Sequence, residues 1–124
     1  MKNFLLLAFA IMLSTNVLAQ KKADITFSVS AVCGMCEDRI EEAYDVKGIV
    51  IADYDLKTKM LHVVYKTKFF NTPLEIHKIA ANAGHDTNKV KATDEAYSNL
   101  HSCCKYRLRG QNCSDDAEDH DDHK

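Results

Sequence analysis

The sequence predicts an α+β fold in which two helices cover one face of an antiparallel sheet, with its elements in the order β-α-β-β-α-β. Three observations support this prediction. An alternating apolar segment comes first, two apolar segments joined by a short polar turn follow, and a strong helix start comes after them. This order is that of a split βαβ sandwich, and one extra C-terminal helix is expected after it.

The first strand is expected at 23–32, where apolar and polar side chains alternate as in a strand with one buried face. A tight Cys-Gly-Met-Cys turn follows it. The first helix is expected at 36–46, with Ile40 and Tyr44 on its buried face and Gly48 just after its end.

Two further strands are expected at 49–55 and 60–66, and the short polar segment Leu-Lys-Thr-Lys between them predicts a hairpin. The second helix begins with a capping box. Thr72 can cap it, Pro73 takes the first helical position, and Glu75 lies three residues after the cap. Its buried stripe continues to an Ala-Gly pair, which ends the helix.

Weaker signals follow the second helix. A last strand is expected at 87–92, and a single third helix at 94–109, with Leu100 and Cys104 on one face. The end of the chain, 114–124, holds six acidic residues, two histidines and one lysine, and too few apolar residues to fold. A solvated end is favoured there over weak binding of a divalent ion.

The first residues predict export. A basic start precedes an apolar run at 4–13, which is shorter than the roughly 20 residues that a membrane-spanning helix needs. Small or apolar residues precede Gln20, where a signal peptidase would cut. We therefore expect secretion across the inner membrane to the periplasm, with no membrane span left after cleavage. The expected organisation is a signal peptide at 1–19, one domain at 20–92, a cysteine-containing helical extension at 93–113 and a disordered acidic tail at 114–124.

Charge and cysteine count narrow the possible functions. The formal net charge is −2, and no part of the chain is basic enough to predict nucleic-acid binding. The chain has five cysteines, and an oxidising compartment favours paired thiols. Because five is odd, at least one cysteine is expected to be free, metal-bound or paired with another molecule.

Cys33 and Cys36 allow three interpretations. A structural disulfide would close a very short loop and would stabilise the fold little. A redox pair of the thioredoxin type fits the position before a helix, which lowers a thiol pKa. However, the chain has no Trp, and its one Pro begins a helix. The third interpretation is a soft-metal site, because two thiolates three residues apart can face one ion, and Cu(I) or Hg(II) accepts few sulfur ligands.

From 23 to 92 the sequence resembles the heavy-metal-associated domain of copper chaperones and periplasmic mercury-binding proteins. The resemblance is carried by the Cys-x-x-Cys turn, by KGIVIADYDLKTKMLHVVY and by PLEIHKIAANAGHDT. It implies a ferredoxin-like βαββαβ sandwich in which Cys33 and Cys36 are the metal ligands. The family usually has Gly-Met two residues before the first cysteine, where this chain has Ser30 and Ala31.

Four other side chains were weighed as ligands of this expected site. Met35, between the two thiols, could be a third ligand, although packing in the core is favoured. The resemblance brings His85, after the Ala-Gly pair, near the metal loop. There it could donate a hydrogen bond to a thiolate or bind the ion, and the alternative is an exposed loop position. His62 and His77 have no ligand-spaced partners and are expected on the solvated surface.

Cys103 and Cys104 lie outside the resemblance. Adjacent cysteines form a strained disulfide, so a pair of ligands or separate partners is expected. The last expected strand would end at the far edge of the sheet, away from the Cys-x-x-Cys turn. A third helix that packs back toward this turn rises about 1.5 Å per residue and would bring the two thiols to it. Cys103 or Cys104, with His101, would then complete a three- or four-ligand site. Alternatively, Cys104 packs as a small buried residue and Cys103 pairs with Cys113.

The expected function is the capture of a thiophilic ion, Cu(I) first and Hg(II) or Zn(II) as alternatives. The ion would pass by ligand exchange to a partner such as a metal transporter or efflux component. No general base, nucleophile triad or phosphate-binding loop is recognisable, so the chain is not expected to be an enzyme. The alternative from a different class is a thiol–disulfide oxidoreductase, with Cys33 as nucleophile and Cys36 as resolving thiol.

Overall fold

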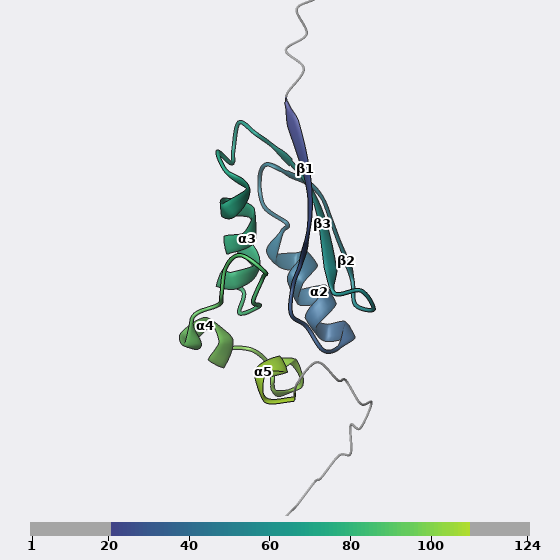
Figure 1. The fold of residues 1–124 in the computed structure, drawn as a ribbon, viewed down its shortest axis with the longest axis vertical. Helices are drawn as coiled ribbons and strands as arrows, with labels where there is room; N and C mark the ends of the chain where they lie inside the picture. Colours follow the sequence, from purple (N-terminus) through teal and green to yellow (C-terminus); the bar gives the residue numbers. More distant parts are fainter. Residues whose placement is uncertain (1–20, 110–124) are drawn as a thin grey trace, which may run out of the picture.

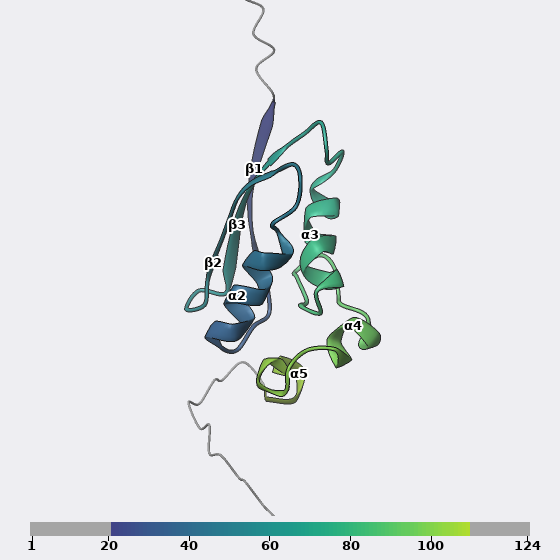
Figure 2. The same cartoon turned by 180° about the vertical axis from the view of Figure 1, so that it is seen from behind.

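The computed structural model describes residues 21–109 of the chain. Its sheet is antiparallel, with the strands in the order β1-β3-β2. The strands are β1 (Lys22–Ser28), β2 (Ile49–Asp55) and β3 (Met60–Lys66). Two ten-residue helices, α2 (Gly34–Ala43) and α3 (Pro73–Asn82), lie side by side on one face of this sheet (Figures 1 and 2). The structure thus confirms the expected α+β, ferredoxin-like class.

Three short elements follow this core and form what we call the extension, residues 93–109. They are α4 (Asp94–Ser98), the 3-10 turn η1 (Ser102–Cys104) and α5 (Tyr106–Arg109). The extension lies at the end of the molecule where β1 leads into α2 (Figure 1). Between residues 21 and 109, no helix has both the length and the apolar character that crossing a membrane requires.

The hydrophobic core lies between the sheet and the two helices. Alternation along β3 buries Leu61, Val63 and Tyr65, as expected for a strand with one covered face. Ile40 from α2 and Ile76 from α3 pack against them and are fully buried. The helix faces were therefore predicted correctly from their 3.6-residue period.

The ends of α3 also follow the sequence signals. The capping box forms, and the Thr72 backbone N–H donates to the Glu75 carboxylate at 3.0 Å. Gly84 follows the helix with φ +101°, a left-handed conformation that side chains rarely adopt. This turn directs the chain toward the loop between β1 and α2.

The strand predicted at 87–92 does not form. A single bridge joins Thr87 to Val29, and the Thr87 N–H then bonds to the Val90 carbonyl in a tight turn. The Asp86 carboxylate accepts the Ala92 N–H at 2.7 Å, which holds this segment curled. An acidic side chain that satisfies a local backbone donor competes with strand pairing, and this explains the error.

The single helix predicted at 94–109 was also wrong, because the segment breaks twice. His101 (φ −56°, ψ 151°) and Lys105 (ψ 66°) leave helical geometry on either side of η1. The breaks allow Leu100, Cys104 and Tyr106 all to reach the core, which one straight helix would not permit. The signal peptide predicted at 1–19, Cys113 and the tail predicted to be disordered at 114–124 lie outside the described residues.

Candidate metal centre

The first cysteine pair is organised by the start of α2. Cys33 is the N-cap residue in extended conformation, and its carbonyl accepts the Cys36 N–H at 2.9 Å. This turn brings the two Sγ atoms to 3.3 Å as free thiols. Cys36 is fully buried, whereas Cys33 is half-buried. A Cβ at Gly34 would meet nothing within 4 Å, so the outer side of this loop is open.

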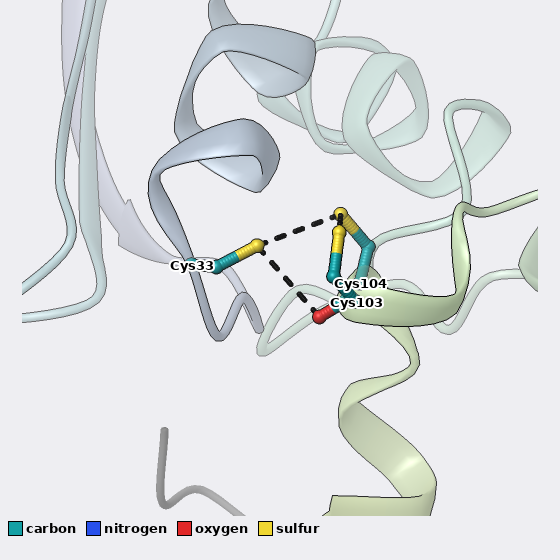
Figure 3. A group of neighbouring side chains, drawn as sticks. All are labelled: Cys33, Cys103 and Cys104. Atoms are coloured by element: carbon teal, nitrogen blue, oxygen red, sulfur yellow. Dashed lines mark hydrogen bonds between the residues drawn. The ribbon is translucent and has the colours of Figure 1, made fainter. Parts of the chain in front are cut away.

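The second cysteine pair lies in η1 and faces the first (Figure 3). The Cys104 Sγ is 3.9 Å from the Cys33 Sγ and 3.9 Å from the Cys103 Sγ. The Cys33 thiol also donates to the Cys103 carbonyl at 3.7 Å. The Sγ atoms of Cys33, Cys103 and Cys104 all lie within 4.8 Å of one another. Among residues 21–109, this is the one group of three potential ligand side chains close enough to share an ion.

Burial differs within the second pair as it does within the first. Cys104 is fully buried and belongs to the hydrophobic core. Cys103 is half-buried, and its Sγ lies 3.5 Å from the Met35 sulfur. Met35 is 51% exposed, so the favoured expectation that it packs in the core was wrong. Its thioether is a further soft donor at the surface of the sulfur cluster.

The extension is held in place by Arg107. Its guanidinium forms two hydrogen bonds with the Asp86 carboxylate, at 2.8 and 3.2 Å. It also donates to the Ala92 carbonyl at 2.7 Å and to Asp94 at 3.2 Å. Burial acts to raise the pKa of Asp86, but hydrogen bonds from Arg107 and from the Ala92 N–H hold it below its usual value. Arg107 therefore joins the end of the extension to its start and to the core domain.

Tyr106 makes a second set of contacts between extension and core. Its hydroxyl donates to the Gly84 carbonyl at 2.8 Å and accepts the Asp86 N–H at 2.9 Å. Burial raises the pKa of Tyr106 to about 12, so the hydroxyl keeps its proton as a donor. A Cβ at Gly84 would lie 2.7 Å from the Ala96 carbonyl oxygen and 2.9 Å from Leu100. The extension thus fits closely only because residue 84 is glycine.

The thiols differ in acidity. Partial burial acts to raise the pKa of Cys33, but hydrogen bonds from Cys36, Cys103 and Cys104 outweigh it and lower that pKa below its ordinary value. Burial raises the pKa of Cys36 and of Cys104. Hydrogen bonding and charge at the neighbouring thiols raise that of Cys104 further. Cys33 therefore ionises before Cys36 and Cys104, whose protons an arriving cation would displace.

The structure brings only some of the predicted ligands together. His85 is fully buried, its Nδ1 donates to the Ser30 carbonyl at 2.8 Å, and its ring stacks on Tyr106. It does not join the thiol group, and its Nε2 has no hydrogen-bond partner among the described residues. The exposed alternative for His85 was wrong. His101 is exposed at the start of η1 and also lies outside the group.

The side chains of His77 and His62 each contact another residue of the core domain. His77 was expected on the solvated surface, but it is only 6% exposed. Its ring packs 3.9 Å from that of Phe27, and its Nδ1 bonds to the Thr87 hydroxyl at 2.9 Å. His62 lies on β3 and pairs with Asp24 at 2.9 Å on the exposed side of the sheet.

Sequence reasoning missed the residues that position the second cysteine pair. Asp86, Tyr106 and Arg107 have no short-range spacing that marks them as a unit. Arg107 is one of three alternating basic residues, with Lys105 and Arg109, so the sequence does not single it out, and its partner Asp86 is 21 residues away. Only the three-dimensional structure shows that these side chains form the anchor of the extension.

Comparisons with known proteins support the fold. A scan against protein-family models gives no match, and a search of curated proteins gives none either. The solution structure of a proposed copper-ion-binding protein from Bacillus anthracis str. Ames is similar, with a TM-score of 0.51 and 19% identity. That similarity covers 56% of this chain and all of the other.

A second similar structure is the N-terminal domain of a potential copper-translocating P-type ATPase from Bacillus subtilis in its Cu(I)-loaded state. It gives a TM-score of 0.50 at 17% identity, over 60% of this chain and 94% of the other. At such identities the likeness is one of fold. It confirms that the chain contains a domain with the fold of heavy-metal-associated domains. On this fold the chain carries four free thiols at one end.

Proposed function

We propose that this chain binds a thiophilic metal ion, Cu(I) in the first place, through Cys33 and Cys36, and passes it to another protein. The observation that carries this proposal is the 3.3 Å approach of the two Sγ atoms at the start of α2. Soft d¹⁰ ions accept two sulfur ligands, and the position at a helix N-terminus favours the thiolate form. The copper-related descriptions of the two similar structures support the choice of ion.

Transfer would proceed by ligand exchange. A thiolate of the receiving protein forms a bond to the ion while the bond to Cys33 breaks, and the bond to Cys36 is exchanged afterwards. Each step forms one metal–sulfur bond and breaks one, so the ion keeps its oxidation state. Cys33 is half-buried and borders the open loop at Gly34, which makes it the accessible member of the pair.

The proposal extends to location and partner. Residues 1–19 would direct the chain across the inner membrane, so the binding would take place in the periplasm. The receiving protein would be a metal transporter or efflux component that presents its own thiolates. Hg(II) suits the same pair of sulfurs, whereas Zn(II) prefers four ligands in a tetrahedron and would need more than this pair.

A second candidate function rests on the acidity of Cys33. A thiol whose pKa is lowered by its neighbours and which lies 3.3 Å from a second thiol is also suited to thiol–disulfide exchange. In that case the Cys33 thiolate would attack a substrate disulfide, form a mixed disulfide and release the first substrate thiol. Cys36 would then attack the Cys33 sulfur, which releases the second substrate thiol and leaves a Cys33–Cys36 disulfide. An insulin-reduction assay separates the two functions, because metal binding alone gives no turnover.

The test of metal binding is an anaerobic titration of the reduced chain with Cu(I) against a chromogenic Cu(I) chelator. The variant Cys33→Ser/Cys36→Ser should lose tight binding while its thermal unfolding shows a folded domain. Cys113→Ser is the matched control, because it removes one thiol from outside the described residues, and it should titrate like the wild type. Equal affinity of the double variant and the wild type would contradict the proposal.

A further inference from the structure

We propose that the extension completes the metal site: Cys104 is a third thiolate ligand, and Cys103 with Met35 forms the entrance to the ion. This inference rests on the proposed function and names the coordination of that same site. It gives the site three sulfur ligands, those of Cys33, Cys36 and Cys104, in place of the two that the Cys33–Cys36 pair supplies.

The sulfur atoms form a continuous series of contacts from the surface to the core. Met35 lies 3.5 Å from Cys103, Cys103 lies 3.9 Å from Cys104, Cys104 lies 3.9 Å from Cys33, and Cys33 lies 3.3 Å from Cys36. Met35 is 51% exposed and Cys103 and Cys33 are half-buried, whereas Cys104 and Cys36 are fully buried. Cys104 and Cys36 are therefore shielded from water and from competing thiols, and Met35, Cys103 and Cys33 are accessible.

The position of Cys104 distinguishes a ligand from a small core residue. A cysteine that only fills space could lie anywhere in the hydrophobic core, since it behaves as a small apolar side chain there. Cys104 instead points its sulfur at the Cys33 thiol at the start of α2 (Figure 3).

The extension is fixed well enough to hold a ligand in place. Leu100, Cys104 and Tyr106 belong to the same hydrophobic core cluster as the sheet and α2. Arg107 adds four hydrogen bonds, two of them to Asp86. Side chains on such packed and hydrogen-bonded segments keep the orientation that coordination requires.

The number of inner sulfurs favours one class of ion. Cu(I) is stable with two or three sulfur ligands, whereas Zn(II) needs four. Among residues 21–109, Cys103 is the further thiol close to the site, within 4.8 Å of Cys33 and Cys104, but its sulfur contacts Met35 at the surface. Cys103 and Met35 together offer an arriving Cu(I) a thiolate and a thioether before it reaches Cys33. At each step along the series one copper–sulfur bond forms as another breaks, without a change of oxidation state.

The decisive experiment counts the ligands. The full reduced chain is loaded anaerobically with one equivalent of Cu(I), and its sulfur coordination is measured by X-ray absorption at the copper edge. Wild type should give three sulfurs, Cys104→Ala two, and the neighbouring control Cys103→Ser three. Two sulfurs in the wild type, or a loss caused by Cys103→Ser and not by Cys104→Ala, would overturn the assignment of Cys104.

A second measurement covers the case in which Cys104→Ala does not fold, which circular dichroism would reveal. Wild-type chain is alkylated with and without bound Cu(I), and each cysteine peptide is quantified by mass spectrometry. Cu(I) should protect Cys104 together with Cys33 and Cys36. Protection of the last two alone would overturn this inference and leave the proposed function standing, whereas no Cu(I) binding at all would end both.

The role of Cys103 and Met35 as the entrance is tested by the rate of Cu(I) release. Release of Cu(I) to an excess of a chromogenic chelator should slow in Cys103→Ser and in Met35→Leu, with the equilibrium affinity little changed. Met60→Leu is the matched control, because Met60 lies on β3, at the start of the strand, and takes no part in the sulfur contacts. Release at the wild-type rate in both entrance variants would show that the ion leaves by another route.

Discussion

The two cysteine pairs of this chain reach the same place by different means. Cys33 and Cys36 are brought together by a single helical turn, through a local hydrogen bond between their own backbones. Cys103 and Cys104 are adjacent, yet they reach the first pair only because the extension docks on the core domain. Each pair has one fully buried and one half-buried thiol. The first site should therefore survive any change that leaves α2 folded, whereas the second depends on distant contacts.

The largest expected effect comes from Gly84→Val. A valine side chain at residue 84 would collide with the Ala96 backbone, and valine is strained in the left-handed backbone conformation that Gly84 adopts. Together these effects should lower the free energy of unfolding by about 3 kcal/mol or more. Alkylation under native conditions should then reach Cys104 but not Cys36. Chemical denaturation measures the stability change.

Gly34→Ala is the matched control for that substitution. Gly34 has open space around its Cα and lies in the first turn of α2. The change should alter stability by less than about 1 kcal/mol, in the stabilising direction. If Gly84→Val exposed Cys36 as readily as Cys104, the two regions would unfold together and the contrast between them would be lost.

A somewhat smaller effect is expected from Arg107→Met. It removes the paired hydrogen bonds to Asp86 and leaves that carboxylate without its cation, which should cost about 2 kcal/mol. Cys103 and Cys104 should become more reactive to alkylation, with the reactivity of Cys36 changed least. Arg39→Met serves for comparison, because Arg39 makes a single long bond of 3.5 Å to the Ala83 carbonyl. It should change stability by less than about 0.5 kcal/mol. Equal alkylation rates in both variants would show that Arg107 does not hold the extension.

Tyr106→Phe sharpens the contrast further. Loss of the hydroxyl removes its bonds to Gly84 and to Asp86, and should lower the free energy of unfolding by about 1 kcal/mol. Tyr44→Phe removes a comparable buried bond, 2.7 Å long, to the Ile76 carbonyl inside the core. Both should lose similar stability in denaturation curves, but only Tyr106→Phe should raise the alkylation rate of Cys104. An equal rise in both would mean that global unfolding, and not undocking, exposes this thiol.

The smallest expected effect is a change of folding stability with pH. Burial lowers the pKa of His85 below its ordinary value of 6.5. As the pH falls below that value, the unfolded chain binds a proton that the folded chain resists, so stability is lost until the folded pKa is passed. Stability should thus be lower at pH 5 than at pH 7.5. His85→Gln should reduce this dependence, with a residual share from His77, whose pKa burial also lowers. An unchanged pH dependence in His85→Gln would contradict this account.

Much of the core domain could be predicted because its signals are local. The alternation around Phe27, the box from Thr72 to Glu75 and the buried stripe at Ile40 each fix one element within a few residues. The strand at 87–92 failed because the side chain of Asp86 satisfies a backbone group that strand pairing would have used. The path of the chain differs as well, because the extension begins at the end of the molecule that holds the α2 loop and need not return from the opposite end (Figure 1).

The candidate site also has one part that could be predicted from the sequence and one part that could not. The proximity of Cys33 and Cys36 follows from three residues of spacing at a helix start. The proximity of Cys104 was foreseen only as one alternative, because it depends on the break at His101 and on the pairing of Arg107 with a residue far along the chain. The geometric reasoning behind that alternative, a continuous helix returning from a far edge, was incorrect even though the thiols do meet.

The separation of the two thiol pairs along the chain has a consequence for the order of folding. Cys33 and Cys104 are in contact across 71 residues. The entropic cost of closing so long a loop means that this contact waits until the intervening sheet and helices have formed. In the unfolded chain, each pair meets internally far more often than it meets the other. The cluster that contains both cysteine pairs therefore forms late in folding, and its formation indicates that the rest of the domain has already folded.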